Sequence, residues 1–536
     1  MRLGLALVAG GLVASCLQQS VKSPTQSGEP WVELKSDHFR VSSDIGEDEA
    51  ARVLASFEET YGLLGRVVFG ADAELPSFTT DAIIFQHHED MNEFVGQGFG
   101  GVYTTSLPND VEPSPTVIAS GTLSPFARLL FAHELTHRFN HVALGPTPTW
   151  LNEGLADYYS TIRGEHAQPV VGEIDPRYMC TPDGLGDLEC YQYEKLPGNR
   201  LPRASEIVQL DHQSFYGTQS VESGVPSFEQ KRARTQNYGV AWLLVHMLMN
   251  GKQSYAQEFQ LAMVMPPSQK KGAALAAIVG RVPAAQLDAD FQQYLKKGMP
   301  WRQHHAPTPP LPAHIERHSL TDGEVLVLWA RLDDWNGKSA RRALQRLQQA
   351  NDLRATSAAF WLGRYNQIHQ NSDRAKELYQ RALDLEPENA EYLYGLLNLY
   401  WSSQSGMSWV EAARSVMVGQ TIQALSKSAH SGSQLNAVAA YQLFSNDVPS
   451  ALATSQKACE SAPDCWPCFH NRAAALYASG ERGDALQAEH EALSRMPEDA
   501  AFKMVELVSS AIRYYELAER DPKAVAGKPS PGLLAP

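Results

Sequence analysis

Two short motifs between His133 and Asp157 have the residue spacing of a zinc-binding site. They read HELTH at 133–137 and TWLNEGLAD at 149–157. His133 and His137 are four residues apart, so on a helix their imidazoles lie on one face. Two neutral imidazoles at that spacing can bind one zinc ion, and the adjacent Glu134 can act as general base on the water that such an ion activates.

The flanking residues supply the helix start, the break and a third ligand. An N-cap serine and a first-turn proline at 124–125 precede an apolar run that leads into HELTH. Glycine and proline residues at 145–148 end this helix and allow a second one to fold back. Glu153, sixteen residues after His137, is then the candidate third ligand. Asp157, four residues after Glu153, can accept the second N–H of a zinc-bound histidine.

Both motifs together resemble the gluzincin metallopeptidases. In that family an HExxH helix supplies two histidine ligands and the base, and an NExxxD helix supplies the glutamate ligand and a supporting aspartate. Asn152, Glu153 and Asp157 match the second motif. The resemblance implies an α+β zincin-like metallopeptidase domain, one Zn²⁺ per chain bound by His133, His137 and Glu153, and a peptide or protein substrate.

Tyr238 is the candidate donor for the oxyanion that forms on the scissile carbonyl of a peptide. It precedes an apolar helical segment and resembles the catalytic tyrosine of aminopeptidase-type gluzincins, although Gly239 follows it directly where that family has Tyr-x-x-Gly. The alternative is an aromatic residue at a helix start that packs on the core. His246, on the same predicted helix, is interpreted as a core histidine with hydrogen-bond partners, and His141 as a surface or supporting residue.

The substrate-binding GxMEN motif of the aminopeptidases is absent from the sequence. A peptide could instead add as an extra strand along an edge at 100–105 or at 116–119. Two other functions stay open: a non-catalytic binding or assembly lipoprotein with a vestigial zinc site, and a zinc hydrolase of a non-peptide bond. An intact Glu134 argues against the first, because a site without selection loses its base.

The N-terminal sixteen residues, MRLGLALVAGGLVASC, have the layout of an export signal. Their apolar stretch is too short to span a bilayer. The run that ends in Cys16 resembles the bacterial lipobox, which implies lipidation of Cys16 and a flexible tether at 17–30. We therefore expect an exported lipoprotein, attached to the membrane only by lipid, and the outer membrane is favoured because Leu17 follows Cys16. The alternative is an ordinary secretory signal.

Six cysteines are consistent with an oxidising compartment. Cys180 and Cys190 bracket a loop rich in glycine and aspartate, and we predict a local disulfide between them. Cys459, Cys465 and Cys468 fall within ten residues, so one of them stays free or pairs between chains. The CWPC sequence has the spacing of a redox motif, but its place at a helix start among repeats favours a structural disulfide.

A repeat of 34 residues appears when 356–389, 432–465 and 466–499 are aligned. Small residues recur at Ala375, Ala451 and Ala485 and again at Ala382, Ala458 and Ala492, and each unit ends in a proline at Pro387, Pro463 or Pro497. The pattern resembles the tetratricopeptide repeat (TPR), in which small residues lie where two helices cross. This resemblance implies an all-α TPR-like domain with a groove for a protein partner. A helical support for the peptidase without a partner is the alternative.

The chain is long enough to need more than one hydrophobic core. A net charge of −15 without a basic stripe excludes nucleic acid as an expected partner. Local patterns predict a strand at 31–41, a helix at 47–66, a buried strand at 81–86, strands near 101–119 and helices at 236–299. The predicted organisation is a signal peptide at 1–16, a tether at 17–30, a metallopeptidase domain at 31–299 with an insertion at 161–235, a proline-rich linker at 300–315, a TPR-like domain at 316–521 and a disordered tail at 522–536.

Overall fold

The computed structural model describes residues 28–521 with several gaps. The gaps are 70–78, 97–100, 105, 108, 113, 122–124, 146, 166–167, 173–179, 183–187, 191–201, 217–227, 252–253, 265–270, 298–313, 403–412, 464 and 497–501. The predicted signal peptide with Cys16, most of the tether, most of the linker and the tail lie outside the described residues. Among the helices that the structure describes, none is both long enough and apolar enough to cross a membrane.

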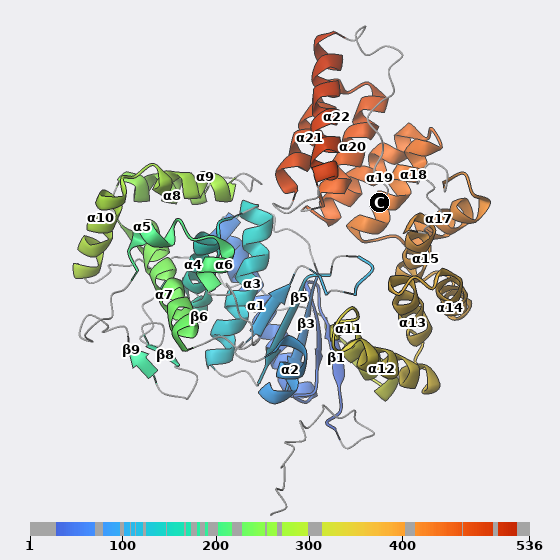
Figure 1. Ribbon diagram of the computed structural model, residues 1–536, viewed down its shortest axis with the longest axis horizontal. Coiled ribbons are helices and arrows are strands. Elements are labelled where there is room, and N and C mark those ends of the chain that lie inside the picture. Colours follow the sequence, from blue (N-terminus) through green and yellow to red (C-terminus); the bar gives the residue numbers. More distant parts are fainter. Residues whose placement is uncertain are drawn as a thin grey trace, which may run out of the picture.

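A mixed sheet of six strands forms the centre of the N-terminal half (Figure 1). Its strands are β1 (Val32–Lys35), β2 (Phe39–Ser43), β3 (Thr80–Phe85), β4 (Gly101–Thr104), β5 (Thr116–Ser120) and β10 (Glu316–Ser319). They lie in the order β10-β1-β2-β3-β5-β4, with β2, β3 and β5 parallel and the remaining pairs antiparallel. The sheet therefore has two edges, and β4 forms one of them.

Residues 31–41 form a hairpin, which corrects the prediction of a single strand. Leu34 of β1 lies opposite Val41 of β2, and the amide of Ser36 donates to the carbonyl of Phe39 across the turn at 2.9 Å. The alternation of buried residues changes phase between Leu34 and Phe39, which marks the turn. The buried strand predicted at 81–86 is confirmed, because all six residues of β3 are buried.

Helices cover both faces of the sheet. The helices of the N-terminal half are α1 (Glu47–Phe69), α2 (His88–Val95), α3 (Pro125–Leu144), α4 (Thr149–Ser160), α5 (Ala204–Ile207), α6 (His212–Tyr216), α7 (Phe228–Asn250), α8 (Ser254–Met263), α9 (Lys271–Gly280) and α10 (Ala284–Lys296). Helices α1 and α3 pack on the face that presents Leu34, Val41, Ile84 and Val117, and α4 and α7 pack behind α3. The helix predicted at 47–66 is confirmed as α1.

The opposite face of the sheet is buried by the helical region rather than left to solvent. Trp31, Phe85 and Ile118 share one core with residues of α2 and of α11 (Asp322–Leu332). The rings of Trp31 and Trp329 lie 6.0 Å apart in an edge-to-face contact. Strand β10 also returns the chain to the sheet after the linker, pairing with β1. The two halves of the protein are thus joined by a continuous hydrophobic core.

The insertion at 161–235 carries two small hairpins in addition to α5, α6 and the start of α7. Strands β6 (Arg163–Glu165) and β7 (Gln168–Val170) form the first, and β8 (Cys180–Pro182) and β9 (Leu188–Cys190) form the second. Cys180 and Cys190 are directly opposite in the second hairpin. Their side chains lie outside the described parts, so the disulfide between them stays a prediction.

The C-terminal region consists of successive antiparallel helix pairs, which confirms the predicted TPR-like repeats. Its helices after α11 are α12 (Ala340–Asp352), α13 (Ala358–Ile368), α14 (Ser372–Leu385), α15 (Ala390–Ser402), α17 (Val416–Ser428), α18 (Gly432–Phe444), α19 (Val448–Ser461), α20 (Trp466–Ser479), α21 (Arg482–Arg495) and α22 (Phe502–Arg520). The three aligned repeats correspond to the pairs α13–α14, α18–α19 and α20–α21. In Figure 1 these pairs follow one another in an arc beside the sheet.

Equivalent positions of the repeats have equivalent environments. All six small residues of the repeat pattern are fully buried: Ala375, Ala382, Ala451, Ala458, Ala485 and Ala492. The turn inside each pair has a left-handed residue at the same position, namely Gln370, Asn446 and Gly480, with φ of 62°, 61° and 95°. The 34-residue period therefore fixes both the helix crossings and the turn.

A polar loop after β4 connects the sheet to these helices. The Asn109 amide donates to the carbonyls of Arg331 and Asp333, at 2.9 and 2.6 Å. Arg331 forms an ion pair with Asp110 at 3.0 Å. Further along the loop, Glu112 accepts hydrogen bonds from the first residues of α18 and the residue before it. The helical region thus holds the loop that follows the edge strand.

Candidate metal centre

Helices α3 and α4 bring the three predicted ligands to one point. The Nε2 atoms of His133 and His137 lie 3.2 Å apart. The Oε2 atom of Glu153 lies 3.3 Å from Nε2 of His133 and 3.5 Å from Nε2 of His137. Ligands about 2.0–2.1 Å from a tetrahedral zinc ion lie roughly 3.4 Å from each other, so this triangle has the dimensions of three zinc ligands.

The unused hydrogen-bonding capacity of these atoms supports the same interpretation. Glu153 Oε2 and His137 Nδ1 are buried and have no hydrogen-bond partner in the part of the chain that the structure describes. A buried carboxylate oxygen without a donor is costly. The three residues form the one group of histidine, cysteine and acidic side chains, within the described ranges, with the spacing of a metal site. The residues present therefore fit a zinc ion.

Asp157 orients the first histidine as the sequence predicted. Its Oδ1 accepts a hydrogen bond from Nδ1 of His133 at 2.9 Å. This bond places the ring proton on Nδ1 and leaves the lone pair of Nε2 directed toward His137 and Glu153. Burial alone would lower the pKa of His133, but Asp157 and Glu153 outweigh it and raise that pKa well above 6.5. The carboxylates around His133 therefore favour a positive charge at Nε2, which a metal ion would supply in place of the second ring proton.

The carboxylates of the site have opposite pKa shifts. Burial raises the pKa of Glu153, yet the two histidines and Tyr216 outweigh that effect and lower it to about 2. Burial raises the pKa of Glu134, and the histidines offset it only in part. A ligand that stays ionised and a base with increased proton affinity are what metal-assisted hydrolysis requires.

Glu134 lies between the metal ligands and the edge of the sheet. Its side chain is buried, and its carboxylate accepts a hydrogen bond from the backbone of Tyr103 in β4. The ring of Tyr103 also stacks near the ring of His137, with centroids 6.3 Å apart. Strand β4 therefore runs beside both the candidate base and a candidate ligand.

Tyr216 is a site residue that the sequence analysis missed. It ends α6 within the insertion, and its hydroxyl donates a hydrogen bond to Oε1 of Glu153. Oε1 of Glu153 thus accepts from Tyr216, and Oε2 faces the two histidines. No spacing rule connects a tyrosine in a poorly patterned insertion to a helix sixty residues earlier, so the sequence held no signal for it.

Tyr238 reaches the site from the interior of α7, not from a helix start. The helix begins at Phe228, ten residues earlier, because the segment before Tyr238 is also helical. Its ring lies 6.4 Å from that of His133 and 6.1 Å from that of Tyr216. Burial, with nearby Glu153, raises the pKa of Tyr238 well above 10, so its hydroxyl stays a neutral donor.

Close packing of α4 against α7 holds this arrangement together. A Cβ atom at Gly154 would lie 2.6 Å from the carbonyl oxygen of Ala241 and 2.7 Å from Cγ2 of Val245. Glycine next to Glu153 thus lets the two helices approach closely enough for Tyr238 to contact the His133 ring.

Of the two other histidines considered in the sequence, the structure describes the side chain of His246 but not that of His141. His246 is buried, with Nδ1 2.8 Å from the Tyr294 hydroxyl and Nε2 2.9 Å from the carbonyl of Gly172. This confirms the interpretation of His246 as a satisfied core histidine. The side chain of His141 lies outside the described residues.

Comparison with known proteins adds no family to this geometry. No protein-family model and no curated protein matches the sequence. Among solved structures, the crystal structure of the yeast Tom70 matches over 61% of this chain and 73% of that chain, with 13% sequence identity and a TM-score of 0.23. An overlap at that level defines neither fold nor function, so the description of the site rests on its own contacts.

Proposed function

We propose that the protein is a zinc-dependent peptidase of the gluzincin type. The observation that carries the proposal is the triangle of His133 Nε2, His137 Nε2 and Glu153 Oε2, with sides of 3.2, 3.3 and 3.5 Å. Three protein ligands leave a fourth position open, as in catalytic rather than structural zinc sites.

The surrounding residues have the chemistry that hydrolysis needs. A zinc ion held by the three ligands would polarise the scissile carbonyl and lower the pKa of water in the site. Glu134, whose proton affinity is increased by burial, takes a proton from the attacking water and returns it to the leaving amine. Tyr238 donates a hydrogen bond to the oxyanion of the tetrahedral intermediate.

The position of β4 favours a peptide over other substrates. Strand β5 pairs with β3 on one side and β4 on the other, whereas β4 pairs on one side only among the strands that the structure describes. Of the two segments suggested by the sequence, the one around 101–104 is therefore the edge. An extended peptide that pairs with β4 passes beside Glu134 and His137. A non-peptide substrate would gain nothing from this strand.

The helical repeats and the N-terminal sequence complete the proposal. Stacked helix pairs of this kind provide a surface for a protein partner, which supports a role in substrate or partner binding. The lipobox-like sequence ending in Cys16 supports an exported protein that is anchored by lipid, with the outer membrane favoured. A non-catalytic binding lipoprotein is the competing proposal, and it shares the repeats but requires no base.

Metal content and cleavage distinguish these functions. Residues 17–536 are purified as wild type, as Glu134→Gln and as Glu388→Gln, an exposed glutamate in the repeat region that serves as the matched control. Each is assayed for zinc by mass spectrometry and for cleavage of a broad peptide library. We expect about one zinc per chain in all three and cleavage by all except Glu134→Gln. Zinc without cleavage in the wild type supports the binding lipoprotein, and no zinc in any of them contradicts the metal site.

A further inference from the structure

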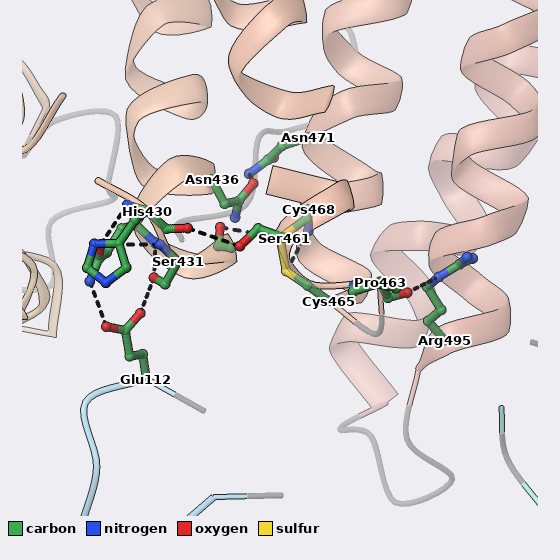
Figure 2. The surroundings of a disulfide bond; sticks show 12 residues. Glu112, His430, Ser431, Asn436, Ser461, Pro463, Cys465, Cys468, Asn471 and Arg495 are labelled. Carbon is green, nitrogen blue, oxygen red and sulfur yellow. Dashed lines mark hydrogen bonds between the residues drawn. A yellow bond between two sulfur atoms is a disulfide. The ribbon is translucent and has the colours of Figure 1, made fainter. Parts of the chain in front are cut away.

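The CWPC sequence forms a disulfide between Cys465 and Cys468 at the start of α20 (Figure 2). Cys465 is the N-cap residue of the helix, and Cys468 lies in its first turn. The backbone N–H of Cys468 donates to Sγ of Cys465 at 3.2 Å. An N-cap sulfur that accepts a backbone hydrogen bond lies where a helix favours negative charge, so a thiolate at Cys465 is stabilised when the bond opens.

The two sulfur-bearing residues differ in accessibility. Cys468 is fully buried in the core formed by α19 to α22, whereas Cys465 and the two residues between them are partly exposed. Cys465 is therefore the more accessible of the two to a reagent in solution. Buried and accessible sulfurs in one pair define which atom is attacked and which leaves.

The surroundings also accommodate the reduced pair. Sγ of Cys468 lies 3.6 Å from the carbonyl oxygen of Gly432, at the start of α18. This oxygen would accept a hydrogen bond from the Cys468 thiol. The amide of Cys468 already provides a donor for Cys465. Reduction thus leaves each sulfur with a hydrogen-bond partner nearby.

This disulfide contributes little to the stability of the fold. It joins residues only three apart, and a short loop gives a disulfide the least entropy to remove from the unfolded chain. The same turn is held by the amide of Cys468, which donates to the carbonyl of Cys465 at 2.9 Å. Arg495 adds a bond from Nε to the carbonyl of Pro463 at 2.6 Å. The helix start is therefore fixed without the sulfur–sulfur bond.

The third cysteine of the cluster provides a contrast. Cys459 is a free thiol, buried in the same core. Burial raises the pKa of Cys459 to about 12, so it stays protonated and unreactive. Three cysteines within ten residues thus divide into a disulfide with one partly exposed member, Cys465, and an inert buried thiol.

We propose that Cys465 and Cys468 form a thiol–disulfide exchange site for a protein dithiol. A thiolate of the partner attacks Sγ of Cys465, the bond between Cys465 and Cys468 breaks, and Cys468 leaves and takes up a proton. The second thiol of the partner then attacks the partner sulfur that is bonded to Cys465, and Cys465 leaves as a thiol. Two electrons and two protons pass from the partner dithiol to the pair, and the partner becomes a disulfide.

The first test uses the wild-type chain without denaturant. Folded protein (residues 17–536) is incubated with dithiothreitol, quenched with N-ethylmaleimide and analysed by peptide mass spectrometry. We expect label on Cys465 within minutes, and on the buried Cys468 and Cys459 only after urea unfolds the helices. If Cys465 also becomes labelled only in urea, the pair is a structural disulfide, and that result would overturn the proposal.

The second test measures which sulfur reacts. In a Cys459→Ser background, Cys468→Ser leaves Cys465 as the thiol of the cluster, and Cys465→Ser leaves Cys468. Circular dichroism confirms that both variants are folded. With the aromatic disulfide 5,5′-dithiobis(2-nitrobenzoate), we expect Cys465 to react at least about tenfold faster than Cys468. Equal rates would contradict the assignment, and neither test depends on zinc.

Discussion

The hydroxyl of Tyr216 donates a hydrogen bond to Oε1 of Glu153, whose other oxygen faces the two histidines. The donor comes from α6 and the acceptor from α4, so a short helix of the insertion fixes the rotamer of a candidate zinc ligand. The insertion therefore contributes directly to the candidate metal centre of the N-terminal half.

Replacing Tyr216 with phenylalanine should weaken zinc binding. The ring keeps its contacts while Glu153 loses the bond that orients it, and partners of this kind change metal affinity by roughly 10–100-fold. Zinc affinity is measured by competition with a chelator of known affinity. Tyr238→Phe serves as the matched control and should bind zinc as the wild type does. Unchanged affinity in Tyr216→Phe would show that Glu153 is oriented by packing alone.

The Tyr238→Phe substitution should instead lower turnover. If the hydroxyl donates to the oxyanion, its loss reduces the catalytic rate by roughly 10²–10³-fold with zinc content unchanged. The rate is measured on a peptide identified from the library. A rate equal to that of the wild type would return Tyr238 to the role of a core aromatic, packed against Phe215 and His133.

The candidate ligands could be predicted from the sequence because they obey local rules. His133 and His137 are one helical turn apart, and Asp157 follows Glu153 by the same spacing, so each helix fixes its own pair. The buried alanines of the repeats were predictable for the same reason. These positions depend on periodicity, which a single sequence contains.

Features that depend on contacts between distant segments could not be predicted. Tyr216 meets Glu153 across 63 residues, and strand β10 joins β1 after nearly the whole N-terminal half. Nothing in the sequence predicted the contact between Trp31 and Trp329. The core shared by the segments before and after the linker was therefore not predicted. Such pairings are set by tertiary packing, which composition and spacing do not encode.

Gly154→Ala tests the close approach of α4 and α7. The new methyl group would meet the backbone of Ala241, which cannot rotate away as a side chain could. We expect a loss of about 1–3 kcal/mol in the free energy of unfolding and weaker zinc binding, because α4 carries Glu153. Gly280→Ala is the matched control, since a Cβ atom there meets nothing within 4 Å and should leave both properties unchanged. Urea denaturation and zinc competition measure the two effects.

The interface between the sheet and the helical region should weaken as pH rises. Glu391, in the first turn of α15, has a pKa raised from 4.5 to about 7 by burial, with Arg331 opposing the shift and Glu112 adding to it. The folded state therefore binds an extra proton between pH 4.5 and about 7. The free energy of unfolding is therefore highest while Glu391 is protonated, and the contribution of Glu391 is lost as pH rises through that window.

A neutral isostere isolates this contribution. Glu391→Gln cannot ionise. Its free energy of unfolding, relative to that of the wild type, should therefore increase by about 3 kcal/mol as the pH is raised from 4.5 to 8. Because the two proteins share every other titrating group, the difference between them reports Glu391 alone. Urea denaturation at half-unit intervals of pH gives the measurement. A difference that stays constant across the range would mean that Glu391 is ionised in the folded protein, with Arg331 and Arg40 compensating its burial.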